Sequence, residues 1–117
     1  MTPHFATGAM EMHRMGFKGA GVKIGIIGTG IHFAHPALGG HFGKGHKVAF
    51  GYDYVGDNYG KDGGNMVARE GGPPHDCKGT STKAAGIIGA VANTFVGVAP
   101  EATLGAYRVI GCYDVLT

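Results

Sequence analysis

The sequence predicts an α/β fold with a mainly parallel sheet. Three short apolar segments contain the β-branched and aromatic residues typical of buried strands, at residues 22–27, 47–55 and 102–111. Between the second and the third, residues 81–93 are mostly small or apolar over a length typical of a helix. The order strand, strand, helix, strand favours parallel pairing, because parallel strands need a long crossover connection.

The elements follow one another in a chain rich in glycine, with 24 glycines among 117 residues. A short helix is expected at residues 8–15, before the turn GFKGAG. The segment VKIGII at residues 22–27 is the clearest buried strand, and a long polar loop with glycine and proline follows the strand candidate at residues 47–55. The glycine content indicates many tight turns and close backbone contacts.

The helix expected at residues 81–93 has an almost wholly small or apolar body, so we expect it to be buried. Thr80 and Ser81 are good N-cap residues for it. Gly86 and Gly89 lie three residues apart on one face, where they would let the helix approach a sheet closely.

Length and composition predict a single domain over residues 1–117, since 44% of the residues are hydrophobic and 15% are charged. The net charge of +2 comes from scattered basic residues, which argues against nucleic-acid binding. No apolar run approaches the roughly 20 residues that span a bilayer, so no membrane association is expected. The first residues lack the apolar segment of a signal peptide, which indicates an intracellular protein or a mature or trimmed secreted form.

Two nucleotide-binding patterns are weakly represented. GTGIHFA from Gly28 contains a glycine pair, and Asp53 follows the second strand as a ribose-binding acid would. Pro36, however, falls where the helix of that motif would run. CKGTST has its lysine before the glycine, which is the wrong order for a phosphate-binding loop. No cofactor is therefore expected.

Histidines raise the question of a metal site. None of them has the HExxH spacing of a helical zinc site, and the cysteines form no CxxC pair. Surface loop histidines are the favoured interpretation, with weak metal affinity left open at His41 and His46. The residues in question are His32, His35, His41, His46, His75 and Cys77.

Two further features stay open on the residues alone. Ser81 and Lys83 would point to different faces of a helix, so a serine–lysine dyad is geometrically poor and helix capping is preferred. Cys77 and Cys112 form one disulfide or remain thiols, and their spacing does not decide between the two.

Four segments in order resemble the subtilisin-like serine proteases (subtilases), in particular the large secreted kind found in fungi and bacteria. IIGTGIHFAHPALGG at residues 26–40 is similar to that family's VIDTGIDYxHPALGG, and DCKGTSTKAAGIIGA at residues 76–90 is similar to its DCxGHGTHVAGIIGA. Residues 42–57 and 95–112 are similar to its connecting segments. The resemblance runs from about Gly8 to Cys112.

The departures from the family pattern fall at its catalytic positions. Gly28 stands where the family has its catalytic aspartate, Lys83 stands at the catalytic histidine, and Thr80 replaces the preceding histidine. The nucleophilic serine and the oxyanion asparagine belong to family segments beyond Thr117. In a Ser-His-Asp mechanism histidine takes the hydroxyl proton and aspartate orients it, so triad proteolysis by this chain is not expected.

The resemblance implies a partial, three-layer (Rossmann-like) subtilase fold, truncated to its N-terminal part. It implies that the strand at residues 22–27 lies beside the strand at 102–111 and has an open edge on its other side. It also places Cys77 and Cys112 at one edge of the sheet, where they would form a disulfide. We therefore expect a homodimer or a complex with another chain, with part of the interface along residues 22–31. The substitution Ile26→Lys tests this. It should dissociate the dimer if the Ile26 side chain lies in the interface, and it should unfold the protein if that side chain lies in the core.

The function expected from these features is that of a catalytically inactive, extracellular binding module for a peptide, a protein or a second copy of the chain. The expected binding residues are Thr80, Ser81, Lys83, His32 and His35, with an anion near Lys83 and the amides that follow Thr80. The alternatives are an enzyme with repurposed chemistry at Lys83 and nearby histidines, or one part of a larger serine peptidase.

Overall fold

The computed structural model describes residues 2–61 and 68–113. The elements in chain order are α1 (Thr2–Thr7), α2 (Ala9–Arg14), β1 (Lys23–Gly28), η1 (Pro36–Leu38), β2 (Val48–Asp53), α3 (Thr80–Gly89) and β3 (Thr103–Arg108). The predicted helix at residues 8–15 and the three predicted strands are confirmed; the first strand is shifted by one residue, and the helix and the other two strands are slightly shorter than predicted. Part of the loop expected after the second strand lies outside the described residues.

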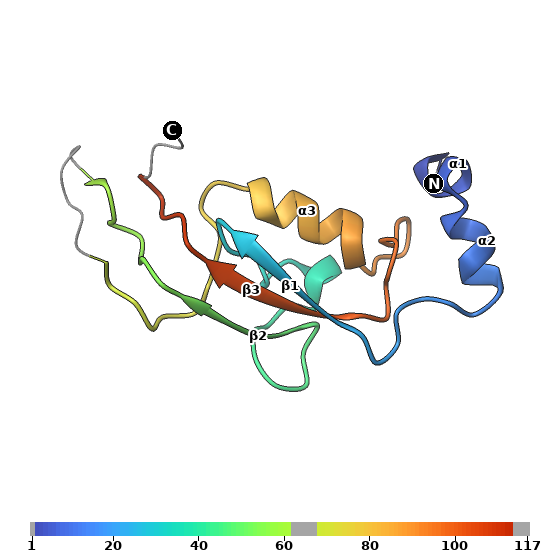
Figure 1. The fold of residues 1–117 in the computed structure, drawn as a ribbon, viewed down its shortest axis with the longest axis horizontal. Coiled ribbons are helices and arrows are strands. Elements are labelled where there is room, and N and C mark those ends of the chain that lie inside the picture. The colour runs from blue at the N-terminus through green and yellow to red at the C-terminus, as the bar shows by residue number, and fades with distance from the viewer. Residues whose placement is uncertain (1, 62–67, 114–117) are drawn as a thin grey trace.

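The three strands form one parallel sheet in the order β1-β3-β2, so β3 lies at the centre (Figure 1). β1 pairs with β3 from Lys23 opposite Thr103 to Gly28 opposite Arg108. β2 pairs with the other side of β3, with an irregularity between Val48 and Phe50. The predicted α/β class with a parallel sheet is confirmed, and all three strands have their carboxyl ends at the same edge of the sheet.

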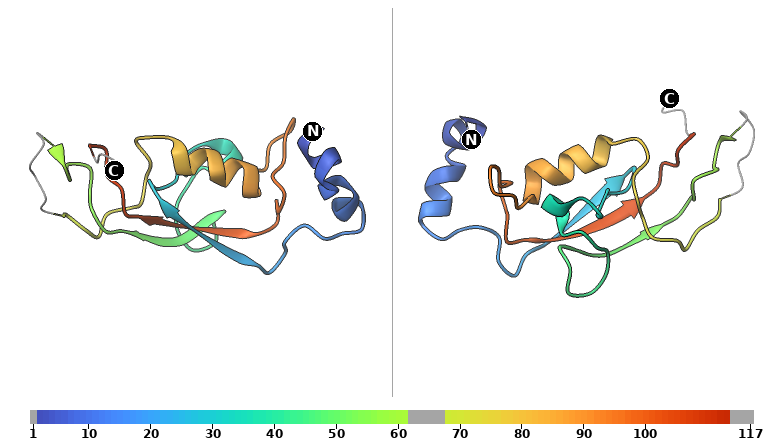
Figure 2. Two further views of the ribbon diagram at one scale, coloured as in Figure 1. Left: turned by 45° about the horizontal axis from the view of Figure 1, so that its top comes forward. Right: turned by 180° about the vertical axis from the view of Figure 1, so that it is seen from behind.

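Helix α3 packs on one face of the sheet, and the short η1 turn lies on the same side (Figures 1 and 2). The core between them contains Ile26, Ala85, Leu104 and Ala106, each no more than 9% exposed. These side chains alternate along β1 and β3 with residues on the opposite face, as the pleat of a strand requires. Burial of this apolar layer is the main stabilising interaction of the fold.

The opposite face of the sheet is covered in part by aromatic side chains of the sheet itself. A methyl group on Gly105 would overlap the ring of Phe50, and one on Gly25 would lie 3.2 Å from the ring of Tyr107. A side chain at either position would therefore meet one of these rings. Ile27, at the edge of this face, remains 73% exposed.

Helix α3 corrects four expectations. It ends at Gly89 rather than at residue 93, and its N-cap is Gly79, with no side-chain capping bond from Thr80 or Ser81. The helix is buried on one side only, since Ile87 is 62% exposed. A methyl group on Gly89 would lie 3.3 Å from the Leu104 side chain, whereas one on Gly86 would meet nothing within 4 Å. Only Gly89 therefore permits the close approach to the sheet.

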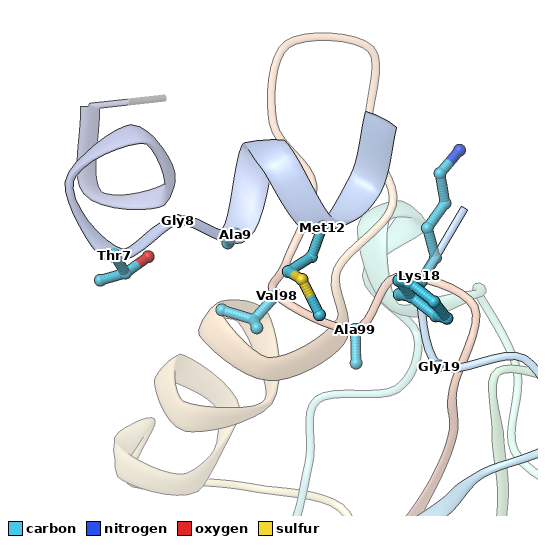
Figure 3. A pocket seen from close by; sticks show the side chains of 9 residues that line it. Thr7, Gly8, Ala9, Met12, Lys18, Gly19, Val98 and Ala99 are labelled. Carbon is cyan, nitrogen blue, oxygen red and sulfur yellow. The ribbon is translucent and has the colours of Figure 1, made fainter. Parts of the chain in front are cut away.

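Helices α1 and α2 lie beyond one end of the sheet (Figure 1). The His4 ring donates to the Val96 carbonyl oxygen at 2.6 Å, and the His13 ring donates to that of Val98 at 2.8 Å. Ala9 and Met12 of α2, together with Val98 and Ala99, line an apolar pocket of about 440 Å³ (Figure 3). The N-terminal helices are thus attached to the loop after α3 rather than to the sheet.

Candidate functional site

The carboxyl end of β1 meets the first turn of α3 through a reciprocal pair of hydrogen bonds. The amide of Thr29 donates to Ser81 Oγ at 2.9 Å, and the amide of Ser81 donates to Thr29 Oγ1 at 3.1 Å. Both residues are buried, with exposed fractions of 2% and 7%. Buried hydroxyls and amides need such partners, so this pair joins the strand to the helix.

Gly28 precedes Thr29 and lies against the same hydroxyl. A Cβ atom built on Gly28 would overlap Ser81 Oγ. Because that oxygen already accepts the Thr29 amide proton, it cannot move aside without leaving a buried donor unpaired. The position that corresponds to the family's aspartate therefore has no room for any side chain while Ser81 keeps this rotamer.

Asp76 supplies the cap that was expected from Thr80 or Ser81. Its Oδ1 accepts the amides of Lys78 and Gly79 at 2.8 and 2.9 Å, and its Oδ2 accepts the Thr82 amide at 3.1 Å and the Thr82 hydroxyl at 2.5 Å. Burial raises the pKa of Asp76, but the hydrogen bonds from Thr82, Gly79 and Lys78 together outweigh it and hold the pKa below its ordinary value.

This cap bears on the prediction of an anion, a carboxylate or a peptide C-terminus near Lys83 and the amides after Thr80, which stays a prediction. The Ser81 amide donates to Thr29 Oγ1 and the Thr82 amide donates to Asp76, so the amides after Thr80 are already used within the chain. The anion at the positive end of the helix is the Asp76 carboxylate itself. An added anion would have to displace it.

The remaining predicted binding residues lie around this helix start. Lys83 and Thr80 are exposed on α3, and the Lys83 amide donates to the Gly79 carbonyl oxygen at 3.0 Å. The amide of His32 donates to Thr82 Oγ1 at 2.8 Å, which fixes the loop after β1 beside α3. His35 and Thr82 line a hollow of about 230 Å³ between η1 and α3.

Two other hypotheses have clear structural outcomes. The rings of His41 and His46 lie with centroids 5.1 Å apart, and both residues are exposed. Within residues 2–61 and 68–113, no third histidine, cysteine or carboxylate joins them in a metal-ligating group.

The glycine loop after β1 leads into the η1 turn at Pro36–Leu38 rather than into a longer helix, unlike a dinucleotide site.

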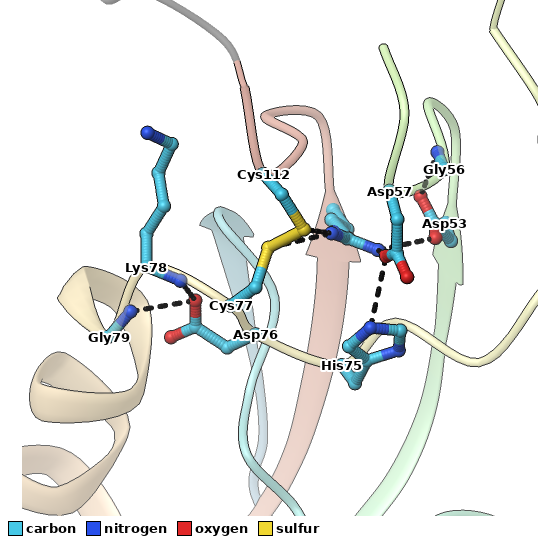
Figure 4. Close-up of a disulfide and its surroundings, with 10 residues drawn as sticks. Asp53, Gly56, Asp57, His75, Asp76, Cys77, Lys78, Gly79 and Cys112 are labelled. Atoms are coloured by element: carbon cyan, nitrogen blue, oxygen red, sulfur yellow. Dashed lines mark hydrogen bonds and ion pairs between the residues drawn. A yellow bond between two sulfur atoms is a disulfide. The ribbon is translucent and has the colours of Figure 1, made fainter. Parts of the chain in front are cut away.

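A second cluster lies at the carboxyl ends of β2 and β3 (Figure 4). Cys77 and Cys112 form a disulfide with Cα atoms 5.6 Å apart. Arg108, which is fully buried, donates through Nη2 to both sulfurs at 3.2 Å. Its Nη1 donates to Asp53 at 2.9 Å and to Asp57 at 2.7 Å.

Asp53 and Asp57 differ in burial within this cluster. The side chain of Asp53 is 4% exposed and also accepts the amides of Val55 and Gly56 at 3.0 and 2.9 Å. Asp57 is 50% exposed, and its Oδ1 lies 3.0 Å from His75 Nε2. The hydrogen bond from Arg108 is the main reason why the pKa of Asp57 lies below its ordinary value.

Sequence reasoning missed the Arg108 cluster, although one signal was available. Asp53 and Arg108 are the last residues of β2 and β3, and the carboxyl ends of parallel strands meet at the same edge of a sheet. The sequence pattern suggests only a ribose-binding role for Asp53. The structure instead uses it as the buried partner of Arg108.

Comparison with known proteins agrees with this geometry. Residues 19–115 match the model of the subtilase family. The chain is 38% identical over 104 residues to the minor extracellular protease Vpr of Bacillus subtilis (strain 168), covering 89% of this chain and 12% of Vpr. It is 35% identical over 105 residues to subtilisin DY of Bacillus licheniformis, covering 87% and 30% of the two chains.

A third relative, thermitase of Thermoactinomyces vulgaris, is 34% identical over 96 residues, which are 80% of this chain and 28% of thermitase. The chain thus spans less than a third of the length of these relatives. None of the described helices has the length and apolar composition needed to cross a membrane. The matched segment includes β1, α3 and β3, and the resemblance noted in the sequence is confirmed: this chain belongs to the subtilase family.

Proposed function

We propose that this chain is a non-catalytic member of the subtilase family that binds another protein chain, with a second copy of itself as the first partner to test. The observation that carries this proposal is the contact between Gly28 and Ser81. The Ser81 hydroxyl occupies the place where the first side-chain carbon of an aspartate would lie. The family's orienting carboxylate is therefore absent, and its space is used for a buried hydrogen bond.

The second catalytic position supports the same conclusion. Lys83 stands where the family has its histidine, and an ammonium group has donors but no acceptor for a hydroxyl proton. These two substitutions lie within this chain, so a serine supplied by any other segment would still lack its base and orienting acid. An extracellular location, as the name of Vpr states for that relative, is part of this proposal.

The open edge of β1 supports the binding role. The Val22 and Gly28 carbonyl oxygens accept amides of the β3 strand and its extension, at 2.9 and 2.8 Å. Since alternate residues of a strand point their backbone groups to opposite sides, Lys23, Gly25 and Ile27 direct theirs to the open edge. Lys23 is the single charged residue of β1. One charged side chain does little to prevent the edge from pairing with another strand.

Ile27 is the residue whose substitution tests pairing at the β1 edge. Ile26 is 9% exposed and belongs to the core cluster, so Ile26→Lys tests folding rather than association. Ile27 is 73% exposed beside the open edge, on the face of the sheet opposite α3, and Ile87 is 62% exposed on α3 itself. Ile27→Lys and Ile87→Lys therefore form a matched pair with the same chemical change.

The test is sedimentation velocity of the full chain from about 1 to 100 μM. We expect a dimer that Ile27→Lys converts to a folded monomer and that Ile87→Lys leaves intact. A wild-type monomer over this range, or a dimer that resists Ile27→Lys, would contradict pairing at this edge. A longer native product whose other segments cover β1 would assign the edge to an intramolecular strand instead.

Catalysis is tested on the same samples. We expect neither peptide turnover nor labelling of Ser81 by fluorophosphonate probes, because the Ser81 hydroxyl is buried and its oxygen accepts the Thr29 amide. The rival enzyme based on Lys83 predicts an activity that Lys83→Ala abolishes. Stoichiometric labelling of Ser81, or turnover sensitive to Lys83→Ala, would overturn the non-catalytic assignment.

A further inference from the structure

The disulfide between Cys77 and Cys112 lies against a buried positive charge (Figure 4). Arg108 is fully buried, and its Nη2 donates to the Sγ atoms of both cysteines at 3.2 Å. A disulfide sulfur is neutral and only a weak hydrogen-bond acceptor. One branch of the guanidinium is therefore directed at atoms that stabilise it poorly while the disulfide is intact.

The other nitrogens of the guanidinium show the same imbalance. Nη1 donates to the carboxylates of Asp53 and Asp57 at 2.9 and 2.7 Å, and these are strong acceptors. Within the described residues, Nε of Arg108 is buried and has no hydrogen-bond partner. A thiolate beside Nη2 would supply the strong acceptor that this side of the guanidinium lacks.

The charged groups around the sulfurs act on a thiolate in opposite directions. A carboxylate oxygen of Asp57 lies within 4.8 Å of both sulfurs and would repel a second negative charge. That carboxylate is half exposed, and it lies 3.0 Å from His75 Nε2 as well as beside Arg108. Solvent screens its repulsion, whereas the attraction of the closer, fully buried guanidinium is screened much less. The balance favours the thiolate.

The two sulfurs differ in their access to solvent. Cys77 is exposed, whereas Cys112 is half-buried. The Asp76 carboxylate next to Cys77 is held away by the start of α3, since it accepts the amides of Lys78 and Gly79 at 2.8 and 2.9 Å. A small nucleophile therefore reaches Cys77 more readily, and exposed disulfides are the ones that exchange with thiols.

Arg108 is held in place by groups other than the sulfurs. It lies in the central strand, opposite Gly28 of β1 and Asp53 of β2. The Asp53 side chain, which is 4% exposed, binds its Nη1 and is itself fixed by the amides of Val55 and Gly56. The positive charge therefore stays at the site when the sulfur–sulfur bond opens.

We propose that this disulfide is a thiol-exchange site, at which a small aliphatic thiol forms a mixed disulfide with Cys77 and Arg108 stabilises the departing Cys112 thiolate. The thiolate of the reagent attacks Cys77 Sγ and forms a new sulfur–sulfur bond. The bond from Cys77 to Cys112 breaks, and its electron pair leaves with Cys112. Exchange is faster when the leaving thiolate is stabilised.

The exchange is balanced without an external oxidant or reductant. One thiol and one disulfide react, and one thiol and one disulfide result. The reagent gives its proton to solvent before the attack, and the Cys112 thiolate either takes up a proton or keeps its charge beside Arg108. The product carries the reagent on the segment before α3 and a free thiol on the segment after β3.

The first test uses the full wild-type chain with β-mercaptoethanol as the probe. Samples taken early are quenched in acid, alkylated with N-ethylmaleimide and mapped by mass spectrometry. We expect the reagent on Cys77 and the maleimide on Cys112. We also expect the folded protein to exchange at least as fast as the same protein unfolded in urea, where the contact with Arg108 is lost. The opposite assignment of the two labels, or slower exchange in the folded protein, would overturn the proposal.

The second test compares two substitutions of basic residues near the disulfide. Arg108→Lys keeps a cation for Asp53 but loses the planar donors that reach the sulfurs. It should slow the exchange by about tenfold, as expected for a lost hydrogen bond to a charged group. Lys78→Ala removes the exposed cation next to Cys77 and should leave the rate unchanged. Equal rates for Arg108→Lys and the wild type would show that Arg108 does not stabilise the thiolate.

A third measurement keeps the result decisive if Arg108→Lys does not fold, which circular dichroism detects. Cys77→Ser leaves Cys112 as the single thiol beside the native Arg108. The ultraviolet absorbance of its thiolate should appear at a lower pH in the folded chain than in the chain unfolded in urea. Ionisation at the same pH or at a higher pH in the folded chain would contradict the proposal. If Cys77→Ser does not fold either, the wild-type labels and rates decide.

Discussion

Gly28 and Ser81 share one small volume, because a methyl group on Gly28 would overlap the Ser81 hydroxyl oxygen that accepts the Thr29 amide. The glycine and the serine thus depend on each other. In the family segments to which these positions correspond, the first residue is aspartate and the second is glycine. The two differences are complementary in volume, because the Ser81 hydroxyl on α3 fills the space that the side chain of the aspartate would need.

A double-mutant cycle tests this dependence. Gly28→Ala should lower the free energy of unfolding by about 1–3 kcal/mol, because the Ser81 hydroxyl must abandon a buried amide. Ser81→Gly should cost a similar amount for the same reason. The double variant should cost little more than Ser81→Gly alone, since the amide is lost only once. Chemical denaturation measures all three, and additive effects would show that the two residues act independently.

Gly86 and Gly89 should respond differently to the same substitution. Gly86→Ala should raise the free energy of unfolding by about 0.5–1 kcal/mol, because alanine is the better helix former and its methyl group meets nothing within 4 Å. Gly89→Ala places its methyl group 3.3 Å from the Ala99 carbonyl oxygen and from Leu104. Thermal and urea unfolding should rank Gly89→Ala below Gly86→Ala by at least about 0.5 kcal/mol, and equal gains would contradict the packing.

Asp76 should make stability depend on acid pH. Its hydrogen bonds lower the pKa of the folded state below the ordinary value of 3.8, so the stabilisation is fully present above that value and is lost as the pH falls through the lowered pKa. Asp76→Asn should cost about 0.5–2 kcal/mol at pH 7 through the weakened helix cap. Its urea midpoint should therefore fall less than that of the wild type between pH 4 and pH 2.

The control for this measurement is Glu70→Gln, which changes an exposed carboxylate in the preceding loop. It should leave the stability at pH 7 within about 0.5 kcal/mol of the wild type. Parallel acid profiles for the wild type and Asp76→Asn would show that this carboxylate does not stabilise the start of α3.

Asp53 and Asp57 both bind Arg108, but their removal should have unequal effects. Asp53→Ala should cost about 3–5 kcal/mol, because it leaves the fully buried Arg108 without its buried counter-ion. Asp57→Ala should cost about 1 kcal/mol or less, because that carboxylate is half exposed and solvent screens its interaction. The free energy of unfolding of both variants is measured by guanidinium denaturation. Equal losses would mean that the two ion pairs do not differ in burial as described.

The sequence alone was sufficient for the strands and for the family relationship. The segments at residues 22–27, 47–55 and 102–111 carry the apolar, β-branched or aromatic pattern that a buried strand needs, and each overlaps a strand. The substitutions at Gly28 and Lys83 can be read directly, because the surrounding motifs fix their positions. These are local properties, visible within a few neighbouring residues.

The end of α3 shows where local pattern was insufficient. The apolar sequence continues to Ala92 and predicts a helix to residue 93, yet the helix ends at Gly89. The amides of Val98 and Ala99 donate to the Ile87 and Ile88 carbonyl oxygens at 2.9 and 2.7 Å, so the returning chain takes the last acceptors of the helix. A helix end set by a distant segment leaves no local signal.

The sites themselves were decided by tertiary structure. Ser81 and Thr29 are 52 residues apart, and Arg108 and Asp53 are 55 apart. Each pair meets because parallel strands bring their carboxyl ends, and the helix that connects them, to one edge of the sheet. The sequence by itself determined which groups are available, namely a glycine, a serine, an arginine and two cysteines. Only the fold decided which of them share a hydrogen bond, a charge or a volume, because those interactions depend on distances that sequence spacing does not contain.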